Sequence, residues 1–229
     1  MEGHGAEAEG EIKMAVLDFF VEESLVAKGA EAELWSGTML GMPVVIKRRI
    51  SKAYRDPALD FKLRVNRTFE EGRLISKAYM AGVSVPAPLF IDPINFMIVE
   101  DYVKGELLRD VVERKGLMHS VGVEVAKMHG AGIVHGDLTT SNVLITSEDK
   151  PVIIDFGLGA FSNDVEDLGV DVLLMKKSLE ANVPAKAGAL YDEFMKGYRE
   201  VAGAASEEVY KRAEEIERRG RYFQERAID

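Results

Sequence analysis

The stretch H-G-D-L-T-T-S-N at residues 135–142, followed by I-I-D-F-G at residues 153–157, decides how the rest of the chain is interpreted. Asp137 and Asn142 lie five residues apart, and Asp155 follows an apolar run. An aspartate can orient an acceptor hydroxyl and take its proton, while an asparagine across a tight loop and an aspartate after a buried strand can hold metal at phosphates. We therefore predict phosphoryl transfer with ATP and Mg²⁺ as cofactors. Asp137 is the predicted catalytic residue, and Asn142 and Asp155 are predicted to bind metal and cofactor.

The same residues match the protein-kinase pattern H-x-D-x-x-x-x-N…D-F-G. Each fragment alone has an ordinary structural explanation, since Asp137 could cap a helix and residues 155–157 could form a turn. Two such fragments in this order, separated by a predicted hairpin of strands 143–145 and 152–154, make that explanation a poor one.

Two further parts of such a site are expected upstream. The apolar run at residues 44–46 ends in Lys47, close to the V-A-I-K form in which a lysine reaches the phosphates. A helical glutamate should pair with it, and Glu70 and Glu71 are both candidates. Glu71 shares a helical face with apolar residues at i+3, i+4 and i+7, whereas Glu70 leans toward basic ones. Lys47 and Glu71 are therefore predicted to be cofactor-binding residues.

A phosphate-covering loop is expected just before the lysine strand. Residues 27–33 contain one glycine, Gly29, and lack the G-x-G-x-x-G pattern. The position of the loop makes Gly29 the predicted cofactor-binding residue, through backbone N–H groups near the phosphates. Residues 99–103 fall where an interlobe hinge should lie, with the register left open.

Strands first and helices later favour an α+β fold with two lobes. We expect short strands at 25–26, 33–35, 44–47 and 96–99, broken by Gly29, Gly37 and a turn at 41–43, and a long helix at 57–80. Helices are expected at 107–112, at 120–129 and throughout the chain after Asp164. The predicted domains are a disordered N-terminus (1–12), a sheet-rich N-lobe (13–100), a reduced helical C-lobe (101–205), and a C-terminal helix with a basic tail (206–229).

Composition limits the classes of function. The formal net charge of −10 argues against a dedicated nucleic-acid binder, and the lack of cysteine excludes a thiolate nucleophile and a Cys-based zinc site. The acidic N-terminus lacks the features of a signal peptide, and no apolar run approaches a membrane span, so we expect a cytoplasmic protein without membrane contact. Residues 47–77 nevertheless hold ten Lys/Arg against four Asp/Glu, which favours a binding face there.

Three departures from the usual kinase pattern narrow the prediction. Gly136 stands where most protein kinases carry an arginine that pairs with an activation-loop phosphate, so no such switch is expected. Only thirteen residues separate Gly157 from Asp171, and no A-P-E motif follows, so the usual platform for a peptide substrate is largely missing. Thr139 replaces a lysine, so transfer to generic substrates should be slow.

These departures and several local strings resemble the small atypical kinase family of the KEOPS complex, called PRPK in human cells. The strings are V-I-K-R at 45–48, K-x-Y-R-x-P-x-L-D at 52–60, R-T-x-x-E-x-R at 67–73, the two stretches quoted first, and R-G-R at 219–221. The resemblance covers about residues 24–225. One departure is Leu168, where the family string has a lysine. In the same string, Asp171 is expected to buttress the catalytic loop.

The resemblance implies a MgATP-dependent atypical Ser/Thr kinase or ATPase. It further implies action beside the threonylcarbamoyl-transferase subunit and other KEOPS subunits, in making threonylcarbamoyladenosine in tRNA. Three alternatives remain open: a RIO-like kinase, a small-molecule kinase of the aminoglycoside or choline type, and a nucleotide-binding module without catalysis. The complete set of predicted site residues argues against the last.

Direct contact with tRNA, or with an acidic partner surface, is a further hypothesis. Arg48, Arg49, Lys52 and Arg55 are expected to form a basic N-lobe face. Ser206 is expected to cap the last helix and Gly220 to end it, so that Arg221 and Arg226 lie on a flexible basic extension. Each phosphate contact would make binding sensitive to salt.

Overall fold

The computed structural model of the chain describes residues 20–226, with the side chains of residues 21–220. The chain divides into two compact units, which are described separately here. One unit runs to Gly72 and includes Ala87–Tyr102, and the other comprises Arg73–Pro86 and the chain from Val103 onward. The predicted disorder at 1–12 and the tail side chains of Arg221 and Arg226 lie outside the described residues.

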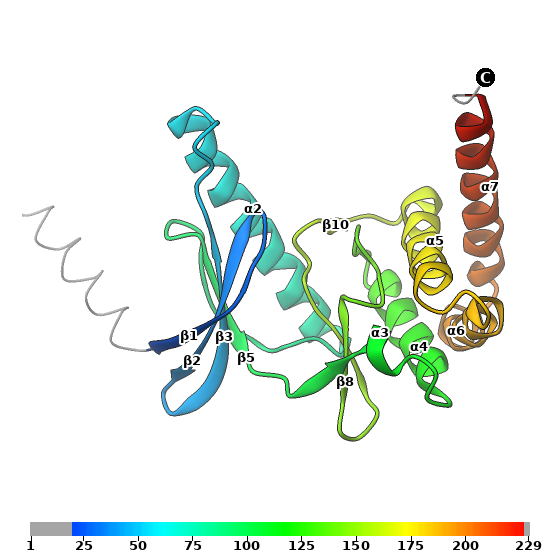
Figure 1. Cartoon of the computed structure of the whole chain (residues 1–229), viewed down its shortest axis with the longest axis horizontal. Helices are drawn as coiled ribbons and strands as arrows, with labels where there is room; N and C mark the ends of the chain where they lie inside the picture. The colour runs from blue at the N-terminus through cyan, green and yellow to red at the C-terminus, as the bar shows by residue number, and fades with distance from the viewer. Residues whose placement is uncertain (1–19, 227–229) are drawn as a thin grey trace, which may run out of the picture. The chain divides into compact units, whose positions relative to one another are not determined.

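The first unit is built on a five-stranded antiparallel sheet (Figure 1). Its strand order is β1-β2-β3-β5-β4, and the strands are β1 (Phe20–Lys28), β2 (Ala32–Met39), β3 (Met42–Arg49), β4 (Pro88–Asp92) and β5 (Met97–Asp101). Val44, Ile46, Met97 and Val99 form its buried core, because alternate residues of a strand face the same side. The four predicted strands are confirmed but are longer than predicted, and β4 was not predicted.

Gly37 does not break a strand, contrary to prediction. It lies inside β2, paired with Glu22 of β1. A Cβ at Gly37 would lie 2.3 Å from the carbonyl oxygen of Val21, so the missing side chain is what allows β1 to approach. The glycine signals a close backbone approach there rather than a turn.

The long helix α2 (Pro57–Met80) has the predicted bounds. The Asp56 side chain accepts hydrogen bonds from the N–H groups of Ala58 and Leu59, both at 3.0 Å, which caps the helix start. Gly82 follows the end of the helix with φ of +74°, a left-handed conformation that glycine adopts without strain. Within the first unit, α2 carries Glu71.

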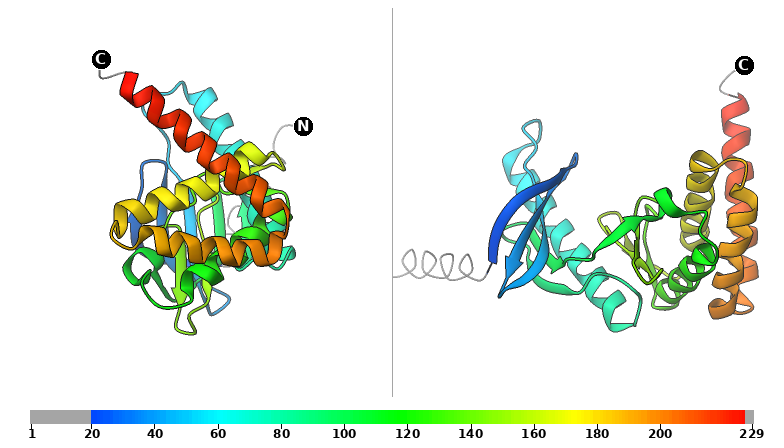
Figure 2. Two further views of the ribbon diagram at one scale, coloured as in Figure 1. Left: turned by 90° about the vertical axis from the view of Figure 1, so that its right-hand side faces the viewer. Right: turned by 60° about the horizontal axis from the view of Figure 1, so that its bottom comes forward.

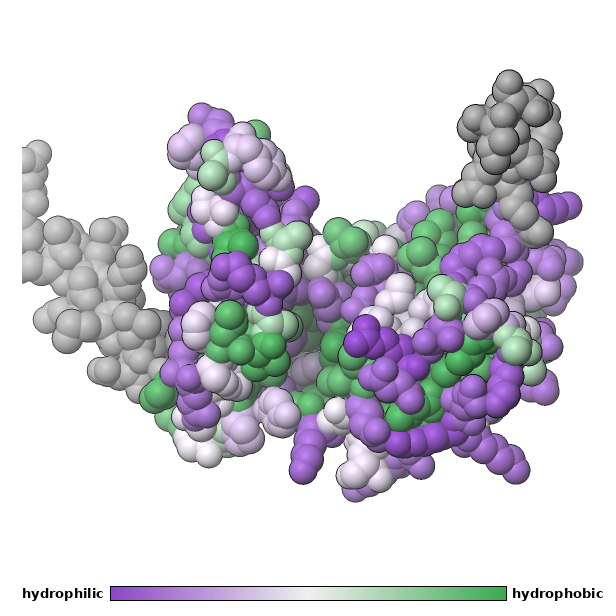
Figure 3. All heavy atoms as spheres, viewed as in Figure 1, coloured by the Kyte–Doolittle hydropathy of each residue, from purple (hydrophilic) through white to green (hydrophobic). Residues whose placement is uncertain are grey.

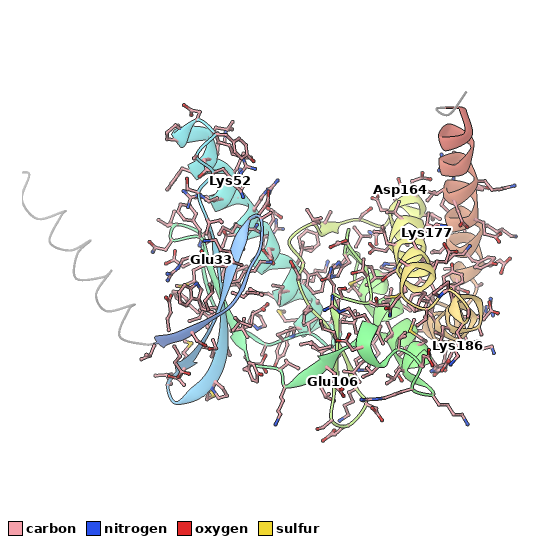
Figure 4. All side chains as sticks on the ribbon, viewed as in Figure 1. Glu33, Lys52, Glu106, Asp164, Lys177 and Lys186 are labelled. Carbon is pink, nitrogen blue, oxygen red and sulfur yellow. The ribbon has the colours of Figure 1, made fainter. Side chains whose placement is uncertain are left out.

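The second unit is mainly helical (Figure 2). Its helices are α3 (Leu108–Val111), α4 (Leu117–Gly130), α5 (Val165–Asn182), α6 (Ala187–Ala202) and α7 (Ala205–Arg226). Its strands form two small sheets, β6-β8-β9 and β10-β7, from β6 (Gly105–Leu107), β7 (Ile133–Val134), β8 (Val143–Thr146), β9 (Pro151–Ile153) and β10 (Ala160–Phe161). The predicted hairpin (β8 and β9) and the helices after Asp164 are confirmed, and the Asp164 side chain caps α5 (Figure 4).

Helices α4 and α6 approach each other at two glycines. A Cβ at Gly122 would lie 2.0 Å from the carbonyl oxygen of Phe194, and a Cβ at Gly197 would lie 1.9 Å from that of His119. No side chain fits at either position. The backbones themselves therefore set the spacing between the two helices.

Helix α7 differs from prediction at both ends. Ser206 lies inside the helix and its hydroxyl donates to the Gly203 carbonyl at 2.6 Å, so it is not the N-cap. Gly220 does not end the helix, which continues to Arg226. Further back, Glu217 is buried and accepts from Lys176 of α5 at 2.6 Å and from Lys177 of α5 at 2.5 Å, which links the two helices. Lys177 is labelled in Figure 4.

Apolar side chains also reach the surface of the sheet. Figure 3 shows green residues there among hydrophilic ones, and the exposed apolar residues include Val21, Leu25, Val26 and Met42 of the strands and Leu40 of the β2–β3 turn. Within residues 20–226, no helix has the length and apolar character needed to cross a bilayer.

Candidate active site

A buried aspartate fixes the backbone of the segment predicted to be catalytic. Asp171 of α5 is fully buried; its Oδ2 accepts from the His135 N–H at 2.6 Å and its Oδ1 from the Gly136 N–H at 2.8 Å. His129 Nε2 lies 3.2 Å from Asp171 Oδ2, and His129 Nδ1 lies 2.8 Å from the hydroxyl of Tyr198. The expected buttressing of the catalytic loop by Asp171 is confirmed.

Gly136 is required by the backbone of this loop. Its φ is +75°, and a Cβ would lie 2.2 Å from the carbonyl oxygen of Leu158. The loop therefore excludes the arginine that most kinases carry at this point, and excludes every other side chain as well.

Asp137 and Asn142 lie in contact across the loop. Asn142 Nδ2 donates to the Asp137 carbonyl at 2.8 Å and to Asp137 Oδ2 at 2.9 Å. Because both partners are acceptors, the amide must present its NH₂ to them, which leaves the carboxamide oxygen as the atom of Asn142 that could hold a metal ion. The chemistry of this oxygen suits Mg²⁺, which prefers oxygen ligands.

Asp155 follows β9 in a strained conformation. Its φ is +64°, in the left-handed region that residues other than glycine rarely adopt, and such strain gathers at functional sites. The Gly157 N–H donates to Asp155 Oδ1 at 3.2 Å, and the side chain is exposed. His135 orders the preceding residue, since its Nε2 lies 3.0 Å from the Ile154 carbonyl and its ring packs on Phe156.

In the first unit, Lys47 and Glu71 form a buried ion pair. Lys47 Nζ lies 2.6 Å from Glu71 Oε1, with Glu71 only 2% exposed. The predicted choice of Glu71 over Glu70 as the partner of Lys47 is confirmed, while the role of the pair toward a nucleotide stays a prediction. Arg49 Nη2 binds the second oxygen, Glu71 Oε2.

Gly29 lies in the β1–β2 connection. Its N–H donates to the Ala32 carbonyl at 2.9 Å, so this amide is used within the hairpin rather than turned toward a phosphate. Two residues on, the Glu31 carboxylate binds Arg67 and lies 3.5 Å from Arg55 and 3.9 Å from Arg49. The hydrogen bond from Arg67 lowers the pKa of Glu31; burial opposes this shift, and the charges of Arg49 and Arg55 add to it.

The predicted basic face of the N-lobe is wrong in its main members. Arg49 is buried against Glu71, Arg55 pairs with Glu31 and Asp60, and Arg48 pairs with Glu22. In the folded chain these arginines therefore form ion pairs with acids from other parts of the sequence. Lys52, labelled in Figure 4, lies half-buried between β3 and α2.

The structure brings together Asp137 with Asn142 in the second unit, and Lys47 with Glu71 in the first. Sequence reasoning missed Arg49 and His129 as parts of the two arrangements. A signal for Arg49 was present, because the period of two along a strand places Arg49 on the same face as Lys47. In the part of the chain that the structure describes, no three His, Cys, Asp or Glu side chains are grouped to hold a metal ion.

Two family models match the chain. One is described as the RIO domain and matches residues 48–160. The other is described as the phosphotransferase enzyme family and matches residues 129–208, which include the loop of Asp137 and Asn142. Both matches support the prediction that the chain is a phosphotransferase of the kinase type.

Solved structures with a similar fold include the Rio2 kinase of Chaetomium thermophilum. Its complex described as "Rio2 kinase-ADP/Mg2+-phosphoaspartate" aligns with a TM-score of 0.64 at 19% identity, covering 94% of this chain and 74% of that one. A second Rio2 structure from the same organism aligns with a TM-score of 0.63 at 18% identity, covering 96% of this chain and 79% of that one. The predicted α+β, protein-kinase-like fold is confirmed.

Some curated relatives are much longer than this chain, and others are of similar length. A "probable bifunctional tRNA threonylcarbamoyladenosine biosynthesis protein" of Methanothermobacter thermautotrophicus is 46% identical over 86% of this chain, but only 36% of that protein is covered. This chain therefore spans about a third of such relatives.

The short relatives match along nearly their whole length. A "probable serine/threonine-protein kinase BUD32 homolog" of Archaeoglobus fulgidus is 45% identical over 79% of this chain and 89% of that protein. "KEOPS complex subunit Bud32" of Pyrococcus abyssi is 39% identical over 86% of this chain and 96% of that protein. The chain therefore belongs to the Bud32 family, the small atypical, RIO-like kinase family of the KEOPS complex.

Proposed function

We propose that the chain binds MgATP and transfers the γ-phosphoryl group to a Ser or Thr hydroxyl, or to water, as the kinase subunit of a KEOPS complex. The observation that carries this proposal is the arrangement around Asp137. Its carboxylate is held 2.9 Å from Asn142 Nδ2, on a loop whose backbone is fixed to the buried Asp171. A carboxylate fixed in this way is suited to orient an acceptor and to accept its proton.

In this proposal the chain's own residues orient the acceptor, neutralise the phosphates and accept a proton. Lys47, positioned by Glu71, neutralises phosphate oxygens, and Asp137 accepts the proton of the attacking hydroxyl or water. Asn142 and Asp155 would hold Mg²⁺, which supplies charge neutralisation at the phosphates when bound. Two protein side chains suit Mg²⁺, which is usually held by one or two protein ligands together with substrate phosphates and water.

The test is ATP turnover by purified protein. Asp137→Ala and Asp155→Ala should each reduce turnover at least about a hundredfold, because each removes a group used in the transfer itself. Glu148→Gln is a matched control, because Glu148 is an exposed acid of the second unit that pairs with Lys150 at the surface. Thermal melts must show that all variants fold. Near wild-type turnover in either alanine variant refutes the assignment.

The proposed partners are the threonylcarbamoyl-transferase subunit and other KEOPS subunits, with a role in threonylcarbamoyladenosine formation in tRNA in the cytoplasm. The proposal is supported by the names of the relatives. ATP turnover should therefore change when purified transferase subunit and tRNA are added. Turnover that is the same with and without both would contradict this part of the proposal.

A small-molecule kinase is a second candidate, because the phosphotransferase enzyme family model matches residues 129–208. The same ATP-turnover assay distinguishes the two candidate functions. Aminoglycosides or choline should leave ATP turnover unchanged if the first proposal holds, and should stimulate it if the second does.

A further inference from the structure

Arg49 is a buried arginine that joins two acids from distant parts of the first unit. It ends β3, two residues after Lys47 and on the same face of the strand. Its Nη2 binds Glu71 Oε2 in α2, and its Nη1 lies 3.9 Å from Glu31 Oε2 in the β1–β2 connection. Glu71 is thus shared between two cations, since Lys47 binds its other oxygen at 2.6 Å.

Stability alone is a poor explanation for this arginine. Its side chain is 5% exposed, and its Nε has no hydrogen-bond partner among the residues that the structure describes. A buried donor without a partner is destabilising, and buried ion pairs often stabilise less than apolar residues of similar volume. Features that cost stability are concentrated at functional sites.

The backbone around Arg49 connects the same parts of the unit. The Arg49 N–H donates to the Phe96 carbonyl at 3.0 Å, and the N–H of Ile50 donates to the Glu31 carbonyl at 3.1 Å. The β1–β2 connection is therefore attached to the end of β3 both by main chain and by the Glu31 carboxylate. Ion pairs of Glu31 therefore help to hold the β1–β2 connection in place.

We propose that Arg49 is a positioning residue for phosphoryl transfer: it holds the oxygen of Glu71 that Lys47 does not bind, and it ties Glu71 to Glu31 of the β1–β2 connection. This inference rests on the proposed function, because it concerns how Lys47 is presented to the phosphates of ATP. With Arg49 present, the negative charge of Glu71 is divided between two cations. Without it, Glu71 binds Lys47 alone and more tightly, so Lys47 interacts less with phosphate.

The test compares the KM for ATP and kcat among variants. Arg49→Gln should raise the KM for MgATP roughly tenfold, a coupling of ordinary size for contacting charged groups. Arg49→Lys keeps the charge but not the fork that reaches both acids, so it should restore part of the loss. Arg48→Gln is the matched control: its arginine precedes Arg49, is half-buried and pairs with Glu22, and its KM should stay within about twofold of wild type.

The role of Glu31 is tested by a double-mutant cycle. Glu31→Gln should raise the KM for MgATP by a smaller factor than Arg49→Gln, and the double variant should resemble Arg49→Gln alone, because Glu31 acts on Glu71 through Arg49. Additive effects would show that Glu31 acts independently and would overturn the tie between the two acids. A purely structural role would lower the folded fraction, and hence the apparent kcat, without moving the KM.

Lys47→Met separates failure of this inference from failure of the proposed function. Loss of MgATP affinity or turnover in Lys47→Met, together with a wild-type KM in folded Arg49→Gln, overturns the inference alone. Wild-type MgATP binding by calorimetry and wild-type turnover in Lys47→Met overturn both. A raised KM in Arg49→Gln, partly restored in Arg49→Lys, supports the inference.

Discussion

Replacement of Asp171 by alanine tests how the loop that carries Asp137 and Asn142 is held. The side chain is fully buried and accepts from the His135 N–H, the Gly136 N–H and His129. Gly136 is exposed, so water can replace its lost bond, but the amide of His135 and the ring of His129 are buried and lose a charged acceptor. At about 1–3 kcal/mol for each such group, Asp171→Ala should lower the free energy of unfolding by about 3 kcal/mol.

The assay is thermal and urea unfolding followed by circular dichroism. A loss of this size should lower the melting temperature by roughly 10 °C in a chain of this length. ATP turnover should also fall at temperatures where the variant is folded, because Asp137 is on the loop that is released. Asp171→Asn should do little better, since its NH₂ group would face a buried donor.

Asp167→Ala is the matched control on the same helix. Asp167 accepts from the Ser162 hydroxyl at 2.6 Å at the surface, so its loss should cost less than about 1 kcal/mol. If Asp171→Ala and Asp167→Ala lose the same stability, the reasoning about buried donors is refuted.

Three further predictions follow from the fold. Gly136→Arg should leave the protein largely unfolded or aggregated on expression, because a Cβ would lie 2.2 Å from the Leu158 carbonyl; a soluble, active variant would contradict this. Phosphatase treatment should leave ATP turnover unchanged, since the loop has no place for an arginine that reads a phosphate, and a large drop would reveal a switch. Burial alone would raise the pKa of Glu217, but hydrogen bonds and charges from Lys176 and Lys177 lower it to about 2. Because the pKa in the folded chain lies below the ordinary value of 4.5, ionised Glu217 should stabilise the fold by roughly 2–3 kcal/mol. This stabilisation should be complete above pH 4.5 and lost as the pH falls toward 2. Urea unfolding of wild type and Glu217→Gln should therefore differ at pH 6 and converge near pH 2, and a constant difference would contradict the pairing.

The pairing of Asp137 with Asn142 and of Lys47 with Glu71 could be predicted from the spacing of these residues. Asp137 and Asn142 must span one tight loop, and Glu71 was separated from Glu70 by helical phase alone. The bounds of α2 were also predicted, and in the structure Asp56 caps its start and Gly82 follows its end in a left-handed conformation.

The charge network of the first unit could not be predicted from local patterns. A run of arginines in sequence indicates a basic face, but the acids that neutralise it come from other elements. Glu31 lies 18 residues before Arg49, and Glu71 lies 22 residues after it. The same limit applies to Gly220, where an isolated helix would tend to end but the packing of α7 on α5 continues it.

The glycine contacts between α4 and α6 have a consequence for how this protein can change over evolution. Because Gly122 and Gly197 each face a main-chain oxygen, no compensating side-chain substitution in the partner helix can make room for a methyl group. Substitution by larger residues therefore cannot change the stability of the core at these two positions, and stabilising substitutions must occur elsewhere. Since α4 leads directly into the strand before His135, the same backbone spacing also helps to fix the position of the loop that carries Asp137.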